Sequence, residues 1–178
     1  VTESILTHLA NDKSKKSYIS SIKKATMFAN QQIRKISNQM NVKMGATFAA
    51  LYFTPRYIFA FWMGDVRIYQ FQNSDVVFQS KDHSMVNELL KERSLSPTEI
   101  ERYSPFVTKC ISGESFMGEV EIIELQDVKN SVFLICSDGF HKTIDPTQIS
   151  LEELKSEEKL NTIACNSQDN LTFILIEG

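Results

Sequence analysis

Two acidic residues stand at the ends of apolar runs, where a metal-binding site could form. Residues 132–139 read Val-Phe-Leu-Ile-Cys-Ser-Asp-Gly, so an apolar run leads to Asp138. Near the C-terminus the order is reversed, because Asp169 precedes the apolar run 171–176. If the two runs are neighbouring antiparallel strands, the end of one lies beside the start of the other. The two carboxylates are then expected at the same edge of a sheet.

The chemistry that such a pair could support is the binding of a hard divalent cation. Two adjacent carboxylates repel each other, and a divalent metal with oxygen ligands removes that repulsion. Gly139 follows Asp138, and glycine allows another group to approach closely. The alternative is that Asp138 and Asp169 are turn residues, because Asp-Gly and Asp-Asn are common turn dipeptides. From the spacing alone, the turn interpretation is favoured.

The elements that position these residues follow from the apolar pattern. Runs 132–136 and 171–176 are typical of short buried strands. Residues 17–38 have a helical period and predict an amphipathic helix. Its expected apolar face consists of Ile22, Ala25, Ala29, Ile33 and Ile36.

The rest of the chain predicts more strands and short helices. Strands in meander order, which predict an antiparallel sheet, are expected at 46–53, 57–63, 66–71 and 76–79. Ser84 is expected to cap one helix, and Ser96 with Pro97 and Glu99 predicts a capping box that begins another. A strand is expected at 119–125, helices between 145 and 164, and a helix already under way at 1–10.

Length and composition indicate one ordinary globular domain. A chain of 178 residues is long enough to bury a core, and it has no run of about 20 apolar residues that could span a membrane. A net charge of −3 argues against a nucleic-acid partner. Three cysteines without metal-binding spacing are expected to be reduced thiols of a cytoplasmic protein. The sequence does not indicate an oligomeric state.

Five short motifs, taken in order, resemble the metal-dependent serine/threonine phosphatases of type 2C. The motifs are Met-Gly-Ala-Thr at 44–47, Gly-Asp-Val-Arg at 64–67, Asp-His-Ser at 82–84, Ser-Asp-Gly at 137–139 and Asp-Asn at 169–170. The segment 108–113 is similar to a family segment that ends in glycine, and the form of Ser-Asp-Gly is closest to the bacterial branch. The resemblance covers residues 1–178 as a single domain, corresponding to the C-terminal three quarters of a family domain.

The resemblance implies an α+β fold of two packed antiparallel β-sheets flanked by α-helices. It also implies two Mn²⁺ or Mg²⁺ ions and hydrolysis of phosphoserine or phosphothreonine in a phosphoprotein substrate by a metal-bound water, without a phosphoenzyme. By position, Asp138 and Asp169 match ligands of one metal of the pair, and Asp82 matches a ligand of a third metal. No catalytic residue other than metal ligands is implied in this range.

Further residues are expected to support the ligands without binding metal themselves. They are Gly139, Asn170, Asp65, His83 and His141. For Asp65 a role in a turn beneath the site is favoured over direct metal binding. For His141 contact with a phosphate is the less favoured alternative, because imidazole also serves as a plain hydrogen-bonding group. Trp62 is expected in the core.

Three departures from the family pattern limit what the resemblance implies. The family's opening strands, which carry an Asp-Gly that bridges both metals, are expected upstream of this sequence. Lys142 stands where the family usually has an acid, and its charge is expected to weaken a third metal site. The run 146–166 is short. The intact domain is therefore expected to be a phosphatase, and the 178-residue chain by itself to be inactive. The alternatives are a pseudophosphatase that acts as a binding scaffold and a regulatory phosphatase of a transcription-factor partner switch.

Overall fold

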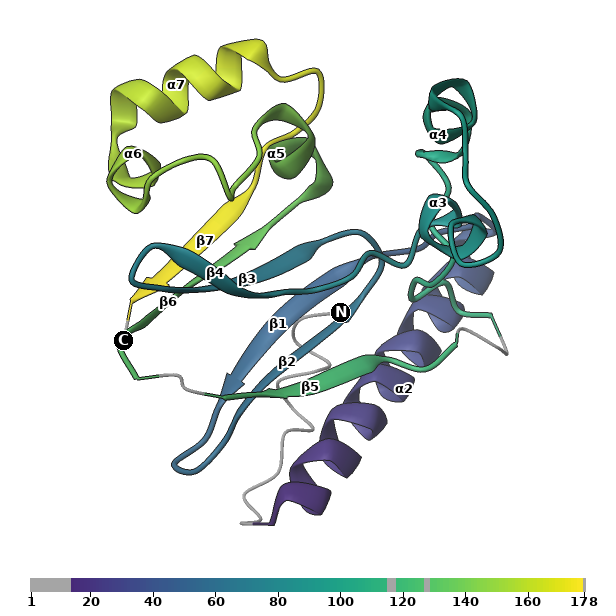
Figure 1. Ribbon diagram of the computed structural model, residues 1–178. Coiled ribbons are helices and arrows are strands. Elements are labelled where there is room, and N and C mark those ends of the chain that lie inside the picture. The colour runs from purple at the N-terminus through teal and green to yellow at the C-terminus, as the bar shows by residue number, and fades with distance from the viewer. Residues whose placement is uncertain (1–13, 115–117, 127–128, 178) are drawn as a thin grey trace. The chain divides into compact units, whose positions relative to one another are not determined.

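The structure is a computed structural model that describes residues 14–114, 118–126 and 129–177 (Figure 1). The chain divides into two compact units. Unit 1 comprises Val1–Gly64 and His83–Glu124, and unit 2 comprises Asp65–Asp82 and Leu125–Gly178. The helix expected at 1–10 lies outside the described residues. Within them, no helix has the length and apolar character needed to cross a membrane.

Unit 1 combines one long helix with a three-stranded sheet (Figure 1). Helix α2 spans Lys15–Met40, as the periodicity predicted. It begins where the Ser14 side chain accepts a hydrogen bond from the Ser17 N–H, at 3.2 Å, and ends at Asn41, whose φ is 51°. Strands β1 (Phe48–Phe53) and β2 (Ile58–Met63) are antiparallel, and β5 (Glu121–Leu125) completes the order β1-β2-β5.

The core of unit 1 lies between α2 and this sheet. Ile22, Ala25 and Ala29 are fully buried and share a cluster with Phe59 and Phe61 of β2. The predicted apolar face of α2 is therefore confirmed from Ile22 to Ile33, since the partly buried Ile33 also packs against this cluster. Ile36 was expected on the same face, but it is 43% exposed.

Two short helices of unit 1 begin at the serines that the sequence indicated. Helix α3 spans Met85–Leu89, and the Ser84 hydroxyl accepts from the Asn87 N–H. Helix α4 spans Pro97–Tyr103 and begins with a complete capping box between Ser96 and Glu99. Both predicted helix starts are confirmed.

Unit 2 is a four-stranded antiparallel sheet with three helices (Figure 1). Its strands, in the order β4-β3-β6-β7, are β4 (Asp75–Gln79), β3 (Arg67–Gln72), β6 (Ser131–Cys136) and β7 (Phe173–Glu177). Its helices are α5 (Asp138–Thr143), α6 (Leu151–Lys155) and α7 (Glu157–Asn166). Phe140 of α5, Leu154 of α6 and Ile163 of α7 are buried together with Leu134 of β6. The helices therefore cover one face of this sheet.

Two antiparallel sheets with flanking helices confirm the expected α+β class, but one part of the strand prediction was wrong. The strands between 46 and 79 were expected in one meander, whereas β1 and β2 lie in one sheet and β3 and β4 in the other. The chain turns at Gly64, whose φ is 107°, and β3 then pairs with the distant β6. Strand β7 also differs from a buried strand, because Ile174 is 56% exposed at the end of the sheet order. That the whole chain works as one domain stays a prediction.

Candidate metal-binding site

The prediction that the two acid-bearing strands are antiparallel neighbours is confirmed. Cys136 at the end of β6 pairs with Phe173 at the start of β7. Beyond this pair, the Ser137 N–H donates to the Thr172 carbonyl at 2.9 Å, and the Thr172 N–H donates to the Ser137 hydroxyl at 3.1 Å. The segments that carry Asp138 and Asp169 therefore lie at the same edge of the unit 2 sheet.

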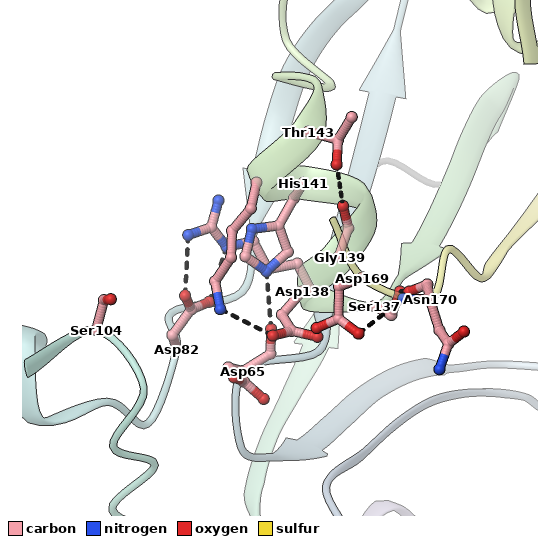
Figure 2. A network of polar contacts seen from close by, with 12 residues as sticks. Asp65, Asp82, Ser104, Ser137, Asp138, Gly139, His141, Thr143, Asp169 and Asn170 are labelled. Carbon is pink, nitrogen blue, oxygen red and sulfur yellow. Dashed lines mark hydrogen bonds and ion pairs between the residues drawn. The ribbon is translucent and has the colours of Figure 1, made fainter. Parts of the chain in front are cut away.

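Gly139 brings the two acidic segments into close contact. A Cβ atom at this position would lie 2.4 Å from the Asn170 carbonyl oxygen and 3.2 Å from the Asp169 Cβ. A side chain of any size would therefore push the segments apart. Figure 2 labels Asp138 and Asp169 at this edge, on either side of the contact at Gly139.

Asp138 is the first residue of α5 and forms an ion pair within that helix. Its Oδ2 accepts from the Lys142 Nζ at 2.8 Å, and its side chain is 31% exposed. Burial acts to raise the pKa of Asp138, but the hydrogen bond and the positive charge of Lys142 outweigh burial and lower it. Asp138 is therefore ionised at neutral pH and already faces one cation.

Asp169 presents its carboxylate in a more open setting. One oxygen accepts from the Asn170 N–H at 2.7 Å, and the Asp169 N–H donates to the Ser167 hydroxyl at 3.2 Å. The residue is exposed. The bond from the Asp169 N–H to the Ser167 hydroxyl joins residues two apart, as in a serine turn, so Asp169 lies in a turn that the side chain of Ser167 forms.

Asp65 and His141 meet through the Asp65 backbone. The His141 Nε2 lies 2.9 Å from the Asp65 carbonyl oxygen. Burial lowers the pKa of His141, so the ring is neutral at pH 7 and donates its Nε2–H to this carbonyl. Burial, and then the nearby negative charge of Asp138, raise the pKa of Asp65. Asp65 thus adds a third carboxylate near Asp138 (Figure 2), and His141 holds its backbone.

Asp82 has both carboxylate oxygens bound to one guanidinium. Arg67 donates to Asp82 through Nε at 2.8 Å and through Nη2 at 2.9 Å, and its Nη1 also reaches the Tyr69 hydroxyl. Burial acts to lower the pKa of Arg67, but the bonds to Asp82 outweigh it. Sequence reasoning missed this pair, although Arg67 ends the Gly-Asp-Val-Arg motif. A metal-binding role for Asp82 stays a prediction.

His83 belongs to unit 1 and supports its packing. Its Nδ1 accepts from the Gly64 N–H at 3.1 Å, and its ring stacks on Trp62 with centroids 6.2 Å apart. Trp62 is 2% exposed, which confirms that it is a core residue. At Gly64 a Cβ would lie 2.2 Å from the Thr47 Cγ2, so two of the motifs are packed directly against each other.

The donor types at the unit 2 edge fit a divalent metal, but their number falls short of a complete site. Carboxylate oxygens of Asp138 and Asp169 are the hard ligands that Mn²⁺ and Mg²⁺ prefer. Within residues 14–114, 118–126 and 129–177, no group of three or more His, Cys, Asp or Glu side chains is arranged to hold a metal ion. Asp138 and Asp169 alone therefore do not complete the ligand set of such an ion.

Comparison with known proteins identifies the family of the chain. Residues 2–172 match the profile of the family described as protein phosphatase 2C. The serine/threonine phosphatases Stp of Listeria welshimeri and Listeria monocytogenes are each 28% identical over 145 residues, which cover 75% of this chain and 57% of the relative. The chain thus spans less than two thirds of the length of these curated relatives.

Solved structures share the fold. Stp1 of Staphylococcus aureus matches with a TM-score of 0.77 at 21% identity, covering 100% of this chain and 78% of that one. PstP of Mycobacterium tuberculosis matches with a TM-score of 0.77 at 20% identity, covering 97% and 77%. A PstP catalytic domain in complex with two manganese ions matches with a TM-score of 0.75 at 20% identity, covering 98% and 77%. From the match over residues 2–172, the chain belongs to the protein phosphatase 2C family.

Proposed function

We propose that the protein to which this chain belongs hydrolyses phosphoserine and phosphothreonine in phosphoproteins with the help of Mn²⁺ or Mg²⁺. The observation that carries the proposal is the meeting of Asp138 and Asp169 at one edge of the unit 2 sheet. Family membership supports the reaction class, and the manganese complex of PstP supports the type of cofactor.

In this proposal the residues of the chain bind the metal ion and position the segments that carry its ligands. Asp138 and Asp169 would hold a divalent ion through carboxylate oxygens. Ser137 and Gly139 keep their two backbone segments in register, and His141 fixes the backbone of Asp65. When bound, the ions supply positive charge to the phosphate and lower the pKa of a bound water.

A second candidate is a binding scaffold without turnover. Two observations favour it: Lys142 already neutralises Asp138, and the described residues lack a group of three metal-ligating side chains. In this case the fold binds a partner protein and metal is not required.

Phosphopeptide hydrolysis distinguishes the two candidates. The assay compares the 178-residue chain with a version extended to the length of the Stp relatives, with and without Mn²⁺. We expect Mn²⁺-dependent phosphate release from the extended version and none from the 178-residue chain. Asp138→Asn should lower that release by at least about 100-fold, because loss of a ligand costs more than the 10- to 100-fold typical of its hydrogen-bonding partners.

Asp75→Asn is the matched control, because Asp75 is an exposed acid of unit 2 at the start of β4. It should leave the rate unchanged. An extended version that folds but gives no metal-dependent release would overturn the enzyme proposal in favour of the scaffold. Full activity in Asp138→Asn would overturn the assignment of this carboxylate.

A further inference from the structure

Lys142 lies within the proposed metal edge and bonds directly to one of its carboxylates. Helix α5 places Lys142 four residues after Asp138, so both side chains lie on the same face of the helix. The Nζ–Oδ2 distance is 2.8 Å. A lysine ammonium therefore occupies a position on Asp138 where a divalent cation would also be attracted.

Lys142 lies in a region of unit 2 that is rich in carboxylates. Asp65, Asp82, Asp138 and Asp169 contribute four carboxylates to this region. Arg67 is fully engaged with Asp82 and Tyr69. Lys142 forms an ion pair with Asp138, and its positive charge also acts to lower the pKa of Asp65.

The bond between Lys142 and Asp138 is weak enough to be exchanged. The two side chains are 50% and 31% exposed. Exposed pairs at this spacing in a helix change an equilibrium by only about 2-fold. A divalent ion with several oxygen ligands would displace such a partner.

The ammonium also has space to move into. Lys142 lines an open hollow of about 530 Å³ together with Gly139, Thr143, Asn166, Gln168 and Asp169. Its side chain can therefore leave Asp138 and remain hydrated, without disturbing the buried core of unit 2. The repulsion between the lysine and the metal would persist, reduced by distance and water.

We propose that Lys142 is an internal competitor of the metal and sets the divalent-cation affinity of the Asp138–Asp169 edge. The proposal rests on the proposed metal-binding function of this edge. A single positive charge about 8 Å from a divalent ion in water weakens its binding by about 5-fold. Loss of the ion pair with Asp138 adds a factor of about 2 in the same direction. Removal of the charge should therefore strengthen Mn²⁺ binding by about 5- to 10-fold.

The test is a Mn²⁺ titration of the 178-residue chain, followed by thermal unfolding and by the electron paramagnetic resonance signal of free Mn²⁺. The variants are Lys142→Gln, Lys142→Arg and Lys159→Gln. Lys159→Gln is the matched control, because it removes an equally exposed lysine of unit 2 that pairs with Glu153 at 3.1 Å. We expect Lys142→Gln to lower the Tm without metal by about 1–2 °C and to bind Mn²⁺ about 5- to 10-fold more tightly. Lys142→Arg and Lys159→Gln should keep the affinity of the parent chain.

The possible outcomes separate this inference from the function on which it rests. If Lys142→Gln binds Mn²⁺ and the parent chain does not, the inference is supported. The same result favours the scaffold candidate for the parent chain. Equal affinity of the parent chain and Lys142→Gln overturns the inference and leaves the metal-binding function intact. No binding by either folded protein up to about 10 mM Mn²⁺, beyond the weakest protein calcium sites, overturns the inference for this chain. The phosphatase proposal is then decided by the phosphopeptide assay on the extended version. Tight binding that survives Asp138→Asn in the Lys142→Gln background also overturns the inference.

Discussion

The family motifs play different physical parts in the two units. In unit 1 they pack: the Ala46 N–H and carbonyl form a two-way bridge with Ile111, and Gly64 lies against Thr47. In unit 2 they carry charge: Asp138 and Asp169 stand at the edge of the sheet, and Arg67 binds Asp82. Motifs of the same family pattern therefore contribute packing contacts in unit 1 and charged side chains in unit 2.

This difference predicts that changes in the two units have separate consequences. Substitutions in the core of unit 1 should reduce stability and leave the metal response of the folded protein unchanged. Substitutions at the charged edge of unit 2 should affect the metal response, with smaller effects on stability. Each prediction below tests that separation.

The largest effect is expected from Phe59→Ala in unit 1. Phe59 is fully buried, with ring centroids 5.8 Å from Tyr57 and 6.1 Å from Tyr18. Its truncation leaves a cavity and should lower the free energy of unfolding by about 3–5 kcal/mol, measured by urea denaturation. Phe53→Ala is the control on β1, where the side chain is 46% exposed. Equal losses of unfolding free energy in both variants would contradict the placement of Phe59 in the core.

A smaller loss is expected from Arg67→Met in unit 2. The change leaves Asp82, whose side chain is 11% exposed, without its two hydrogen bonds from Arg67. We expect a loss of about 2 kcal/mol in urea denaturation, typical of bonds between charged groups. The double variant Arg67→Met/Asp82→Asn should recover part of it, because the Asp82 charge that Arg67 offset is also removed. No recovery would indicate that the two residues act independently.

Gly139→Ala sharpens the comparison at the charged edge. The added Cβ would lie 2.4 Å from the Asn170 carbonyl oxygen, so the two segments must separate. We expect a loss of about 1–2 kcal/mol in unfolding free energy together with weaker Mn²⁺ binding. Gly45→Ala in unit 1 is the control, because its Cβ would meet neighbours only at 3.5 Å or more. Unchanged Mn²⁺ affinity in Gly139→Ala would contradict the role given to this glycine.

The smallest effect concerns pH and helix α4 of unit 1. The ion pair with Arg93, and then the bonds from Ser96, lower the pKa of Glu99 to about 2. Because the folded pKa lies below the ordinary value, this support for α4 is complete above about pH 4.5 and is lost as the pH falls toward 2. NMR titration of the Glu99 side chain should show the low midpoint, and Arg93→Gln should raise it. An unchanged midpoint in that variant would assign the shift to the capping box alone.

The sequence predicted the local structure well because its signals are local. The period of 17–38, the serines before α3 and α4, and the apolar runs of β6 and β7 each depend on neighbours in the chain. The separation of the β1-β2 and β3-β4 hairpins into different sheets was missed, since it depends on pairing between β3 and the distant β6. Helix α5 was also missed, because residues 138–143 are too few to show a period.

The candidate site was predicted only in part, because part of it depends on local signals and the rest on contacts between distant segments. Two apolar runs, with the supposition that their strands pair antiparallel, were sufficient to bring Asp138 and Asp169 to one edge. The partners of the remaining groups were not visible, because the pairing of Arg67 with Asp82 and the contact of His141 with the Asp65 carbonyl join separate segments. That Lys142 weakens a third metal site stays a prediction, and its ion pair with Asp138 was not foreseen.

The most direct test of the central claim is an NMR titration of the isotopically labelled 178-residue chain with Mn²⁺. A paramagnetic ion broadens the signals of amides near its binding site. We predict that the amide signals of Gly139 and Asn170 disappear first, that excess Mg²⁺ restores them, and that Asp138→Asn removes the effect. Broadening that is uniform, or that begins at unit 1 amides such as Gly113, would contradict a metal site at the Asp138–Asp169 edge.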